Sequence, residues 1–175
     1  MQIEGRRDFL PVNIAVLTVS DTRTEADDRS GNTLIERLEG AGHKLAARAI
    51  VRDEADLIAA RMQDWIDNPE IDVIISTGGT GVTGRDVTPE ALNRIAEKEI
   101  PGFGELFRWI SYQKIKTSTI QSRAMGAVAK GTYIFALPGS TGACKDAWED
   151  ILVHQLDART TPCNFVELMP RLQEK

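Results

Sequence analysis

The sequence has few of the residues that build disulfide frameworks or zinc sites, and it has no long apolar run. Its 175 residues include two cysteines, Cys144 and Cys163, and two histidines, His43 and His154, with no CxxC pair and no zinc-site spacing. No stretch approaches the roughly 18 apolar residues of a membrane-spanning helix, and the N-terminus lacks the apolar run of a signal peptide. We therefore expect a cytoplasmic protein with reduced thiols and no membrane partner.

The chain also lacks an excess of positive charge. It has 21 lysine and arginine residues against 26 aspartate and glutamate residues, which gives a formal net charge of −5. Nucleic-acid-binding proteins usually carry a basic patch or arm, so we expect no nucleic-acid partner. This charge balance does not exclude a small anionic ligand that local groups hold.

Apolar runs alternate with amphipathic segments along most of the chain. Apolar, β-branched runs predict strands over 13–20, 43–51, 71–77 and 132–138. Helical periodicity predicts helices over 30–40, 54–67, 88–97, 102–115 and 141–156. Ser30, Asp53 and Thr88 are residue types that cap helix N-termini, and Pro89 suits a first helical turn.

This alternation predicts an α/β fold, a three-layer sandwich with a mostly parallel sheet and helices on both faces. The length suits a single domain over residues 1–175. We take residues 1–11 as an N-terminal extension and residues 157–175 as a C-terminal tail.

The stretch STGGTGVTGRD at 76–86 contains four glycines directly after a predicted strand. It matches G-x-G-x-x-G, but the next helix signal comes too late for a dinucleotide fingerprint. It also begins like a P-loop, but Arg85 and Asp86 stand where lysine and a hydroxyl residue are required. Both motifs share exposed backbone N–H groups at a strand end, which favour phosphate or carboxylate. A glycine-rich turn without a ligand is the alternative.

Two carboxylates fall beside this predicted anion site. Asp86 closes the glycine stretch, and Asp53 follows the second strand, whose end we expect beside those of the first and third strands. A carboxylate next to a phosphate site is repulsive unless a cation intervenes, and Mg²⁺ takes one or two carboxylates plus phosphate oxygens. The pattern favours magnesium-assisted phosphoryl or nucleotidyl chemistry. The alternatives are that Asp86 pairs with Arg85 or completes a turn, and that Asp53 only caps a helix.

Four segments in this order resemble the MoaB/MogA family of molybdenum cofactor biosynthesis proteins: TGGTGVTGRDVTPEAL, PGFGELFR, TSTIQSRA and ALPGSTGACKDAWEDIL. The resemblance covers roughly residues 12–165, and the ending QLDARTTPCNF looks more like the MoaB branch. It implies a molybdopterin-binding fold and an adenylyltransferase that converts MgATP and molybdopterin into adenylyl-molybdopterin and pyrophosphate. The alternatives are a non-catalytic molybdopterin carrier or scaffold and an unrelated nucleotide hydrolase.

The resemblance also implies site residues. Asp53 and Asp86 would be the catalytic and metal-binding carboxylates for Mg²⁺, although Glu54 is an alternative to Asp53. Molybdopterin would contact Thr77, Gly78, Gly79, Thr80, Gly81, Ser118, Ser122 and Arg123. The strand-end loops that would line the side of ATP contain Ser20, Asp21, Pro138, Gly139 and Ser140.

The family resemblance further implies a homo-oligomer, either a homo-trimer or a homo-hexamer. Phe107 and Trp109 lie on the predicted helix over 102–115. Large aromatic side chains are mostly buried, so we assign both to the core, with a subunit interface as the alternative.

Overall fold

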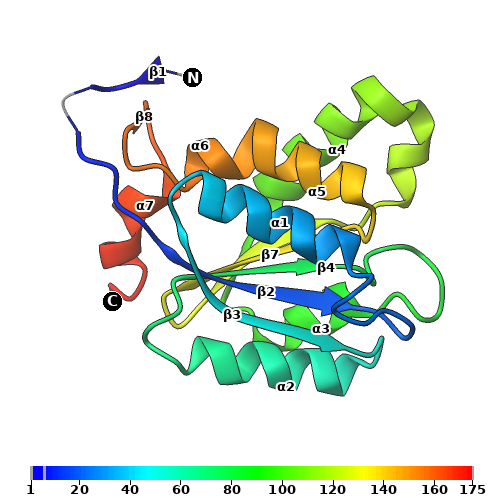
Figure 1. Cartoon of the computed structure of the whole chain (residues 1–175). Helices are drawn as coiled ribbons and strands as arrows, with labels where there is room; N and C mark the ends of the chain where they lie inside the picture. Colours follow the sequence, from blue (N-terminus) through cyan, green and yellow to red (C-terminus); the bar gives the residue numbers. More distant parts are fainter. Residues whose placement is uncertain (1, 6, 175) are drawn as a thin grey trace.

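A six-stranded sheet runs through the middle of the protein, with helices on both faces (Figure 1). The computed structural model describes residues 2–5 and 7–174. In spatial order the strands are β3 (Lys44–Val51), β2 (Asn13–Val19), β4 (Val73–Thr77), β7 (Thr132–Leu137), β6 (Met125–Ala129) and β5 (Lys98–Ile100). The first four are parallel, and β6 runs antiparallel to both of its neighbours. The predicted three-layer fold with a mostly parallel sheet is therefore confirmed.

The helices form two layers that cover separate cores. One face carries α1 (Arg29–Gly40), α4 (Pro101–Ile115) and a continuous helix made of α5 (Thr141–Ala147), the π-helical η2 (Trp148–Leu152) and α6 (Val153–Gln155). The other face carries α2 (Ala55–Ile66) and α3 (Thr88–Ile95). Alternate residues of each central strand enter the two cores, so β2 and β4 are buried on both sides. This burial explains why their sequences read as continuous apolar runs.

The sequence prediction missed β5, β6 and the short helix η1 (Lys116–Gln121) between α4 and β6. β6 reads Met-Gly-Ala-Val-Ala, and these small residues carry little of the β-branched signal that marks a strand. β5 has three residues and lies at the sheet edge, where side chains are largely exposed. Because β6 was missed, the reversal of chain direction at this side of the sheet was missed as well.

The predicted order of the strand ends needs a correction. β2 lies between β3 and β4, so the end of β3 adjoins the end of β2 and does not adjoin that of β4. A parallel crossover placed the third strand on the far side of the first, which alternation along the sequence does not specify. Asp53 nevertheless reaches the loop after β4, as described below.

A buried carboxylate anchors α1. The prediction that Ser30 caps this helix is wrong: Asp28 precedes it and accepts a bond from the Gly31 N–H at 2.9 Å, while Ser30 is buried in the first turn. Asp28 also accepts from the Thr18 hydroxyl at 2.7 Å and from Arg48 Nη2 at 3.0 Å. Burial raises the pKa of Asp28, but these three bonds outweigh it and leave the pKa below its ordinary value.

The other two predicted caps are also wrong. α2 begins after Glu54, which makes no side-chain cap bond, so Asp53 lies outside the helix. α3 begins at Thr88 itself, after Val87, and Pro89 follows in the first turn. The Thr88 hydroxyl donates instead to the Gly78 carbonyl at 2.9 Å. Both predicted caps therefore have other contacts, and both lie beside the glycine stretch.

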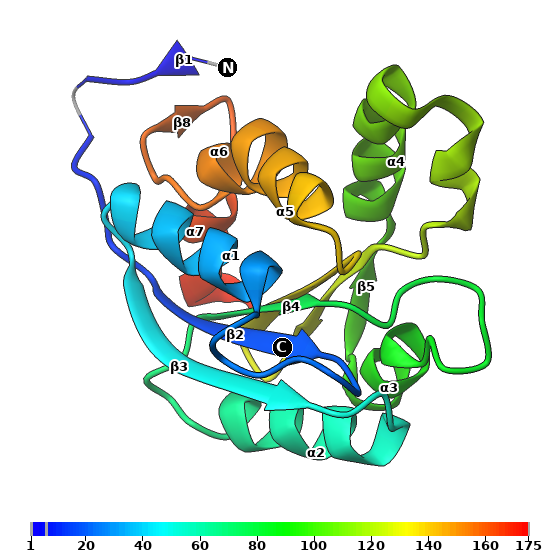
Figure 2. The same cartoon turned by 45° about the vertical axis from the view of Figure 1, so that its right-hand side comes forward.

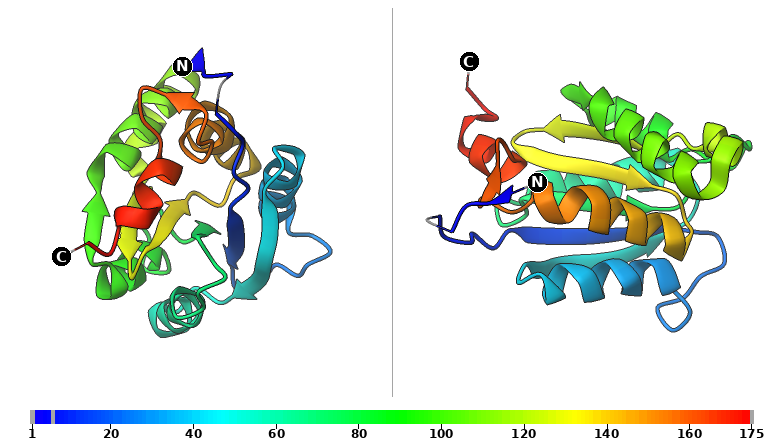
Figure 3. Two further views of the ribbon diagram at one scale, coloured as in Figure 1. Left: turned by 90° about the vertical axis from the view of Figure 1, so that its left-hand side faces the viewer. Right: turned by 90° about the horizontal axis from the view of Figure 1, so that it is seen from above.

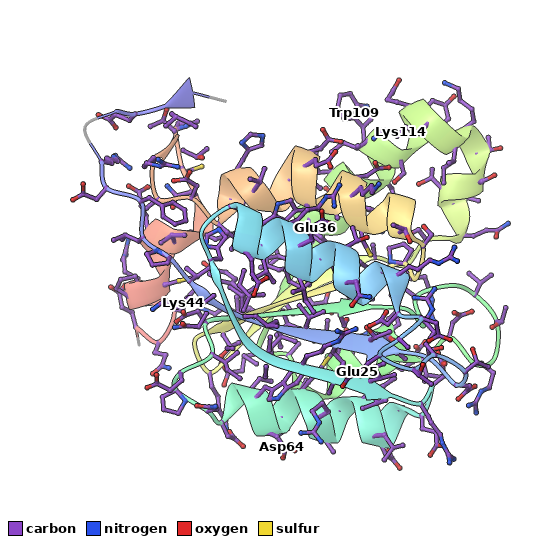
Figure 4. All side chains as sticks on the ribbon, in the orientation of Figure 1. Glu25, Glu36, Lys44, Asp64, Trp109 and Lys114 are labelled. Carbon is purple, nitrogen blue, oxygen red and sulfur yellow. The ribbon has the colours of Figure 1, made fainter. Side chains whose placement is uncertain are left out.

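The two aromatic residues of α4 have opposite surroundings. Phe107 is 1% exposed and packs in the core, as predicted, whereas Trp109 is 65% exposed. Figure 4 shows Trp109 on the outer side of α4, away from the sheet. The assignment of Trp109 to the core is therefore wrong, because it lies on the face of α4 opposite Phe107.

The N-terminal and C-terminal segments both lie at the amino-terminal side of the parallel strands, away from the loops at their carboxyl ends (Figure 3). β1 (Gln2–Ile3) pairs with β8 (Thr160–Thr161) in a two-stranded antiparallel sheet. α7 (Phe165–Leu168) and η3 (Met169–Arg171) complete the C-terminal tail. Among the described residues, no helix is long and apolar enough to cross a membrane.

The Asp28 contacts predict a large stability effect. Asp28→Asn should lower the free energy of unfolding by about 3 kcal/mol, because it leaves the partly buried Arg48 guanidinium without its charge partner. The control is Glu36→Gln on the same helix, where the side chain is 82% exposed, and it should change stability little. Urea denaturation measures both.

The pH dependence tests the same interaction. Because the pKa of Asp28 is lower in the folded protein, its contribution is present above the ordinary aspartate pKa of 3.8 and is lost as the pH falls below it. The stability of Asp28→Asn should depend less on pH in this range. An unchanged unfolding midpoint in Asp28→Asn at neutral pH would contradict the assignment.

Candidate functional site

The loops after β2, β3, β4 and β7 surround a cleft at the carboxyl edge of the sheet (Figure 2). We call it the polar cleft; its volume is about 440 Å³. It is lined by Val19, Ser20, Arg23, Asp53, Gly78, Gly79, Thr80, Gly81, Asp86, Pro138, Gly139 and Ser140. The structure thus brings together residues from all four loops that the sequence singled out.

The floor of the polar cleft is the glycine loop, residues 78–87, and its first two residues must be glycine. Gly78 has φ +107° and Gly79 has φ +65°. A Cβ at Gly78 would lie 2.2 Å from the Val19 carbonyl oxygen, and one at Gly79 would lie 2.4 Å from the Thr88 hydroxyl. The loop therefore packs directly on the end of β2 and on the start of α3, with backbone facing the cleft.

The two predicted carboxylates lie over this loop. Asp53 Oδ1 is 3.2 Å from the position that a Cβ at Gly79 would take, and Asp86 Oδ2 is 2.7 Å from the corresponding position at Gly81. Both aspartates line the polar cleft. The structure therefore supports the expected juxtaposition of two carboxylates with the glycine loop.

The two carboxylates have opposite pKa shifts. Burial raises the pKa of Asp53, and the nearby Asp21 carboxylate raises it further. Burial also acts to raise the pKa of Asp86, but hydrogen bonds from the Thr83 hydroxyl and N–H outweigh it, so this pKa is lowered. Asp86 therefore completes a turn with Thr83, as one of the alternatives proposed. Asp53 is the carboxylate whose charge is only partly compensated, because burial and the Asp21 carboxylate outweigh the nearby Arg85.

Arg23 is a cation of the polar cleft that the residue-by-residue prediction missed. Its Nη2 donates to the Gly139 carbonyl at 3.0 Å, its Nη1 bonds to the Ser30 hydroxyl, and it lies 3.6 Å from the Asp28 carboxylate. The Ser20 hydroxyl accepts from the Arg23 N–H at 3.2 Å and fixes the start of this loop. The sequence could have indicated Arg23, because it lies in the loop after the strand predicted over 13–20.

Asp21, Arg85 and Glu54 lie outside the lining of the cleft. Arg85 donates to the Asp21 carboxylate from Nε at 3.1 Å and from Nη2 at 2.6 Å, so it does not pair with Asp86. The Asp21 carboxylate also accepts from the Asp53 N–H at 3.3 Å. Glu54 lies 3.6 Å from Arg52. The geometry therefore favours Asp53 over Glu54 as the cleft carboxylate, and Asp21 positions the Asp53 backbone.

Thr77 does not offer its hydroxyl to the cleft. Thr77 is fully buried, and its hydroxyl donates to the Pro138 carbonyl at 3.0 Å and lies 3.2 Å from Cys144 Sγ. Burial raises the pKa of the Cys144 thiol to about 11, so this cysteine stays neutral. The predicted contact between molybdopterin and Thr77 is therefore not supported, whereas Thr80 lines the cleft.

A second cavity of about 430 Å³, the apolar cavity, adjoins the polar cleft. It lies between α4, η1 and the start of α5, and its lining includes Phe107 and Ile115 as well as the predicted residues Ser118 and Ser122. The two cavities share four lining residues: Thr80, Gly81, Pro138 and Ser140. A molecule large enough to occupy both would therefore lie across the glycine loop.

The lining of the polar cleft fits a hard cation. The carboxylates of Asp53 and Asp86 supply oxygen donors, which Mg²⁺ prefers over nitrogen or sulfur. Within residues 2–5 and 7–174, no group of three histidine, cysteine, aspartate or glutamate residues is placed to hold a metal. Two carboxylates suffice when phosphate oxygens and water complete the coordination, as is usual for Mg²⁺.

The sequence comparisons identify the class of protein that this fold and cleft define. Residues 15–158 match the family described as a probable molybdopterin binding domain. The chain therefore belongs to the MoaB/MogA family of molybdenum cofactor biosynthesis proteins, as the four sequence segments predicted.

Individual relatives agree with this assignment. The chain is 50% identical over 158 residues to molybdenum cofactor biosynthesis protein B of Escherichia coli K12, which covers 90% of this chain and 93% of the relative. A crystal structure of a molybdenum cofactor biosynthesis protein B is 41% identical, with a TM-score of 0.83 over 86% of this chain and 94% of the other. The tungsten cofactor synthesizing protein MoaB from Pyrococcus furiosus is 34% identical, with a TM-score of 0.73 and coverage of 81% and 91%.

The glycine loop provides a test with an internal control. Gly78→Ala should destabilise the protein by about 2 kcal/mol or more, because the new Cβ meets the Val19 carbonyl and φ is positive. Gly84→Ala, in the same loop, has nothing within 4 Å of the new Cβ and should unfold as the wild type does. Chemical denaturation of both variants makes the comparison. Equal stability of the two variants would contradict the close packing at Gly78.

Proposed function

We propose that this protein is a Mg²⁺-dependent molybdopterin adenylyltransferase, which joins ATP and molybdopterin into adenylyl-molybdopterin and releases pyrophosphate. The observation that carries the proposal is the pair Asp53 and Asp86 over the glycine loop in one cleft. Family membership supports molybdopterin as the ligand. We assign the reaction to the cytoplasm, where ATP is available.

The chemistry requires alignment more than acid–base groups. The terminal phosphate of molybdopterin is already an anion, so its oxygen can attack the α-phosphorus of ATP without a general base. A new P–O bond forms, the bond to the pyrophosphate oxygen breaks, and pyrophosphate leaves. Bound Mg²⁺ would neutralise charge that accumulates on the phosphates. The residues contribute by holding both phosphates in line in a preorganised site.

Each part of the site suits one part of this reaction. The N–H groups of Gly79 and Thr80 would hold the phosphate of molybdopterin at the floor of the cleft, because the Gly78 N–H donates to the Leu137 carbonyl at 3.0 Å and the Gly81 N–H bonds to Asp86. Asp53 and Asp86 would hold Mg²⁺, and Arg23, the cation of the cleft lining, would contact an ATP phosphate. The apolar cavity, with Ser118 and Ser122 on its wall, suits a flat ring system with polar edges.

A carrier without catalysis is the second candidate. The observation in its favour is that the Asp86 carboxylate already bonds to Thr83 and stabilises a turn, a role that needs no metal. The elevated pKa of Asp53 argues for the enzyme, because a carrier gains nothing from a partly compensated carboxylate that costs stability.

The decisive assay mixes purified protein, molybdopterin and MgATP and measures adenylyl-molybdopterin and pyrophosphate. We expect product from the wild type and a loss of about a hundredfold or more in Asp53→Asn and Asp86→Asn, because each removes a charge that the metal requires. Both variants should still bind molybdopterin. Tight binding of molybdopterin by the wild type with no product would refute the enzyme and favour the carrier.

The melting temperature provides the matched control for Asp53→Asn. The folded protein holds a proton on Asp53 more tightly than the unfolded chain does, so ionised Asp53 costs stability at neutral pH. Asp53→Asn should therefore melt at or above the wild-type temperature without ligand, and MgATP should raise the melting temperature of the wild type more than that of the variant. This result would separate loss of function from loss of folding.

We also propose that the protein is a homo-oligomer, a trimer or hexamer as the family resemblance implies. The support is a row of exposed apolar residues at three-residue spacing on α4, formed by Leu106, Trp109, Tyr112 and Ile115. Trp109→Glu should lower the mass measured by light scattering toward that of the 19.3 kDa chain. Lys98→Glu, on the exposed edge strand β5, is the control. A wild-type mass of one chain would refute the proposal.

A further inference from the structure

Arg123 binds the glycine loop from the segment that lines the apolar cavity. Its Nε donates to the Gly81 carbonyl at 2.6 Å, and its Nη2 donates to the Asp86 carbonyl at 2.6 Å. Its backbone N–H donates to the Thr80 carbonyl at 2.9 Å, and its Nη1 pairs with Glu90 of α3. Each guanidinium nitrogen of Arg123 is thus engaged within the protein.

These contacts fix the two residues whose other groups face the polar cleft. The guanidinium is planar, so donors on its fork hold the carbonyls of Gly81 and Asp86 at a set separation. The Asp86 carboxylate lies against Gly81, 2.7 Å from the position of a Cβ there. The bonds of Arg123 therefore hold the backbone of Gly81 and Asp86, and this backbone determines where the Asp86 carboxylate lies in the cleft.

Arg123 also connects this loop to the apolar cavity. Ser118 and Ser122 line that cavity, and Arg123 is the next residue along the chain. Arg123 itself lines neither the polar cleft nor the apolar cavity. A ligand in the apolar cavity would therefore touch the segment that carries Arg123 without touching its guanidinium.

We propose that Arg123 is a positioning residue, which holds the Asp86 carboxylate at the polar cleft and couples it to the wall of the apolar cavity. This proposal rests on the adenylyl-transfer function proposed above and replaces the predicted contact between Arg123 and molybdopterin. A molybdopterin bound in the apolar cavity acts on Asp86 through the 118–123 segment. The two substrates are thereby linked through protein contacts as well as through their own reaction.

The variants Arg123→Lys and Arg123→Gln separate positioning from anion binding. Lysine keeps a point charge that binds phosphate, but it cannot bridge two carbonyls with a planar fork. Arg123→Lys should lower kcat by about tenfold to a hundredfold, since small displacements of aligned groups carry losses of this size. It should raise the Mg²⁺ concentration for half-maximal rate and change the KM for molybdopterin by less than about twofold.

A ligand-free measurement tests the loop directly. Hydrogen exchange of the amides of Thr83 and Asp86, which bond within the loop at 2.8 and 3.1 Å, should be about tenfold faster in both Arg123 variants. The charge control is Arg94→Gln, which removes an exposed pair with Asp56 and leaves the loop untouched. Its exchange and kcat should match the wild type.

Two results would overturn the proposal. One is near-wild-type kcat in Arg123→Lys together with a raised KM for molybdopterin in Arg123→Gln, which is the pattern of a direct anion contact. The other is wild-type exchange of the loop amides in both variants. If the wild type forms no adenylyl-molybdopterin, the proposed function fails, and the exchange experiment still decides whether Arg123 positions the loop.

Discussion

The buried carboxylate of Asp28 is the interaction on which one end of the sheet and the adjoining cleft depend. It joins β2 through Thr18, β3 through Arg48 and α1 through Gly31, all within hydrogen-bond distance. A buried charge with so many partners tolerates few other arrangements, because any displacement leaves a charged group without compensation. Asp28 also lies 3.6 Å from Arg23, so the same carboxylate orients a cation of the polar cleft. One carboxylate thus joins β2, β3 and α1 to one another and to a cation of the cleft.

The cleft itself combines one stabilised and one destabilised carboxylate. Asp86 belongs to a turn whose hydrogen bonds stabilise its negative charge, whereas Asp53 is partly buried beside the Asp21 carboxylate. Pairs of titratable groups with opposite shifts are typical of functional sites. A folded chain keeps an unfavourable charge where a ligand compensates it, which is the usual relation between stability and activity.

Sequence reasoning recovered the fold where local signals and burial agree. The strands over 13–19 and 73–77 are buried on both faces, and their unbroken apolar runs leave little alternative. The glycine loop was also found, because Gly78 and Gly79 occupy backbone conformations that other residues rarely adopt. Parallel topology places the loops at one edge, so Asp53 and Asp86 line one cleft as grouped, although the predicted order of the strand ends was wrong.

Two of the errors share a physical cause, because each depends on a partner distant in sequence. The Thr77 hydroxyl turns to Pro138, 61 positions away, and Arg123 turns to Gly81, 42 positions away. The predicted Thr88 cap failed because its hydroxyl bonds to Gly78 across the loop, whereas the Ser30 cap failed because Asp28, two positions earlier, caps the helix. The residue type determines which hydrogen bonds a side chain can make, but the tertiary fold determines which partner lies within reach.

The reversal of chain direction at β6 determines how the segment before this strand is attached to the sheet. Because β6 runs against the other strands, its first residue, Met125, pairs beside the carboxyl end of β7 at Ala136. The segment between α4 and β6 therefore lies outside the sheet and passes beside the apolar cavity before β6 begins. The short helix η1, Lys116–Gln121, can therefore change in length without disturbing any strand register. Arg123, at the end of this segment, is instead held in place by the carbonyls of Gly81 and Asp86, and the glycine loop is held by its packing against β2 and α3.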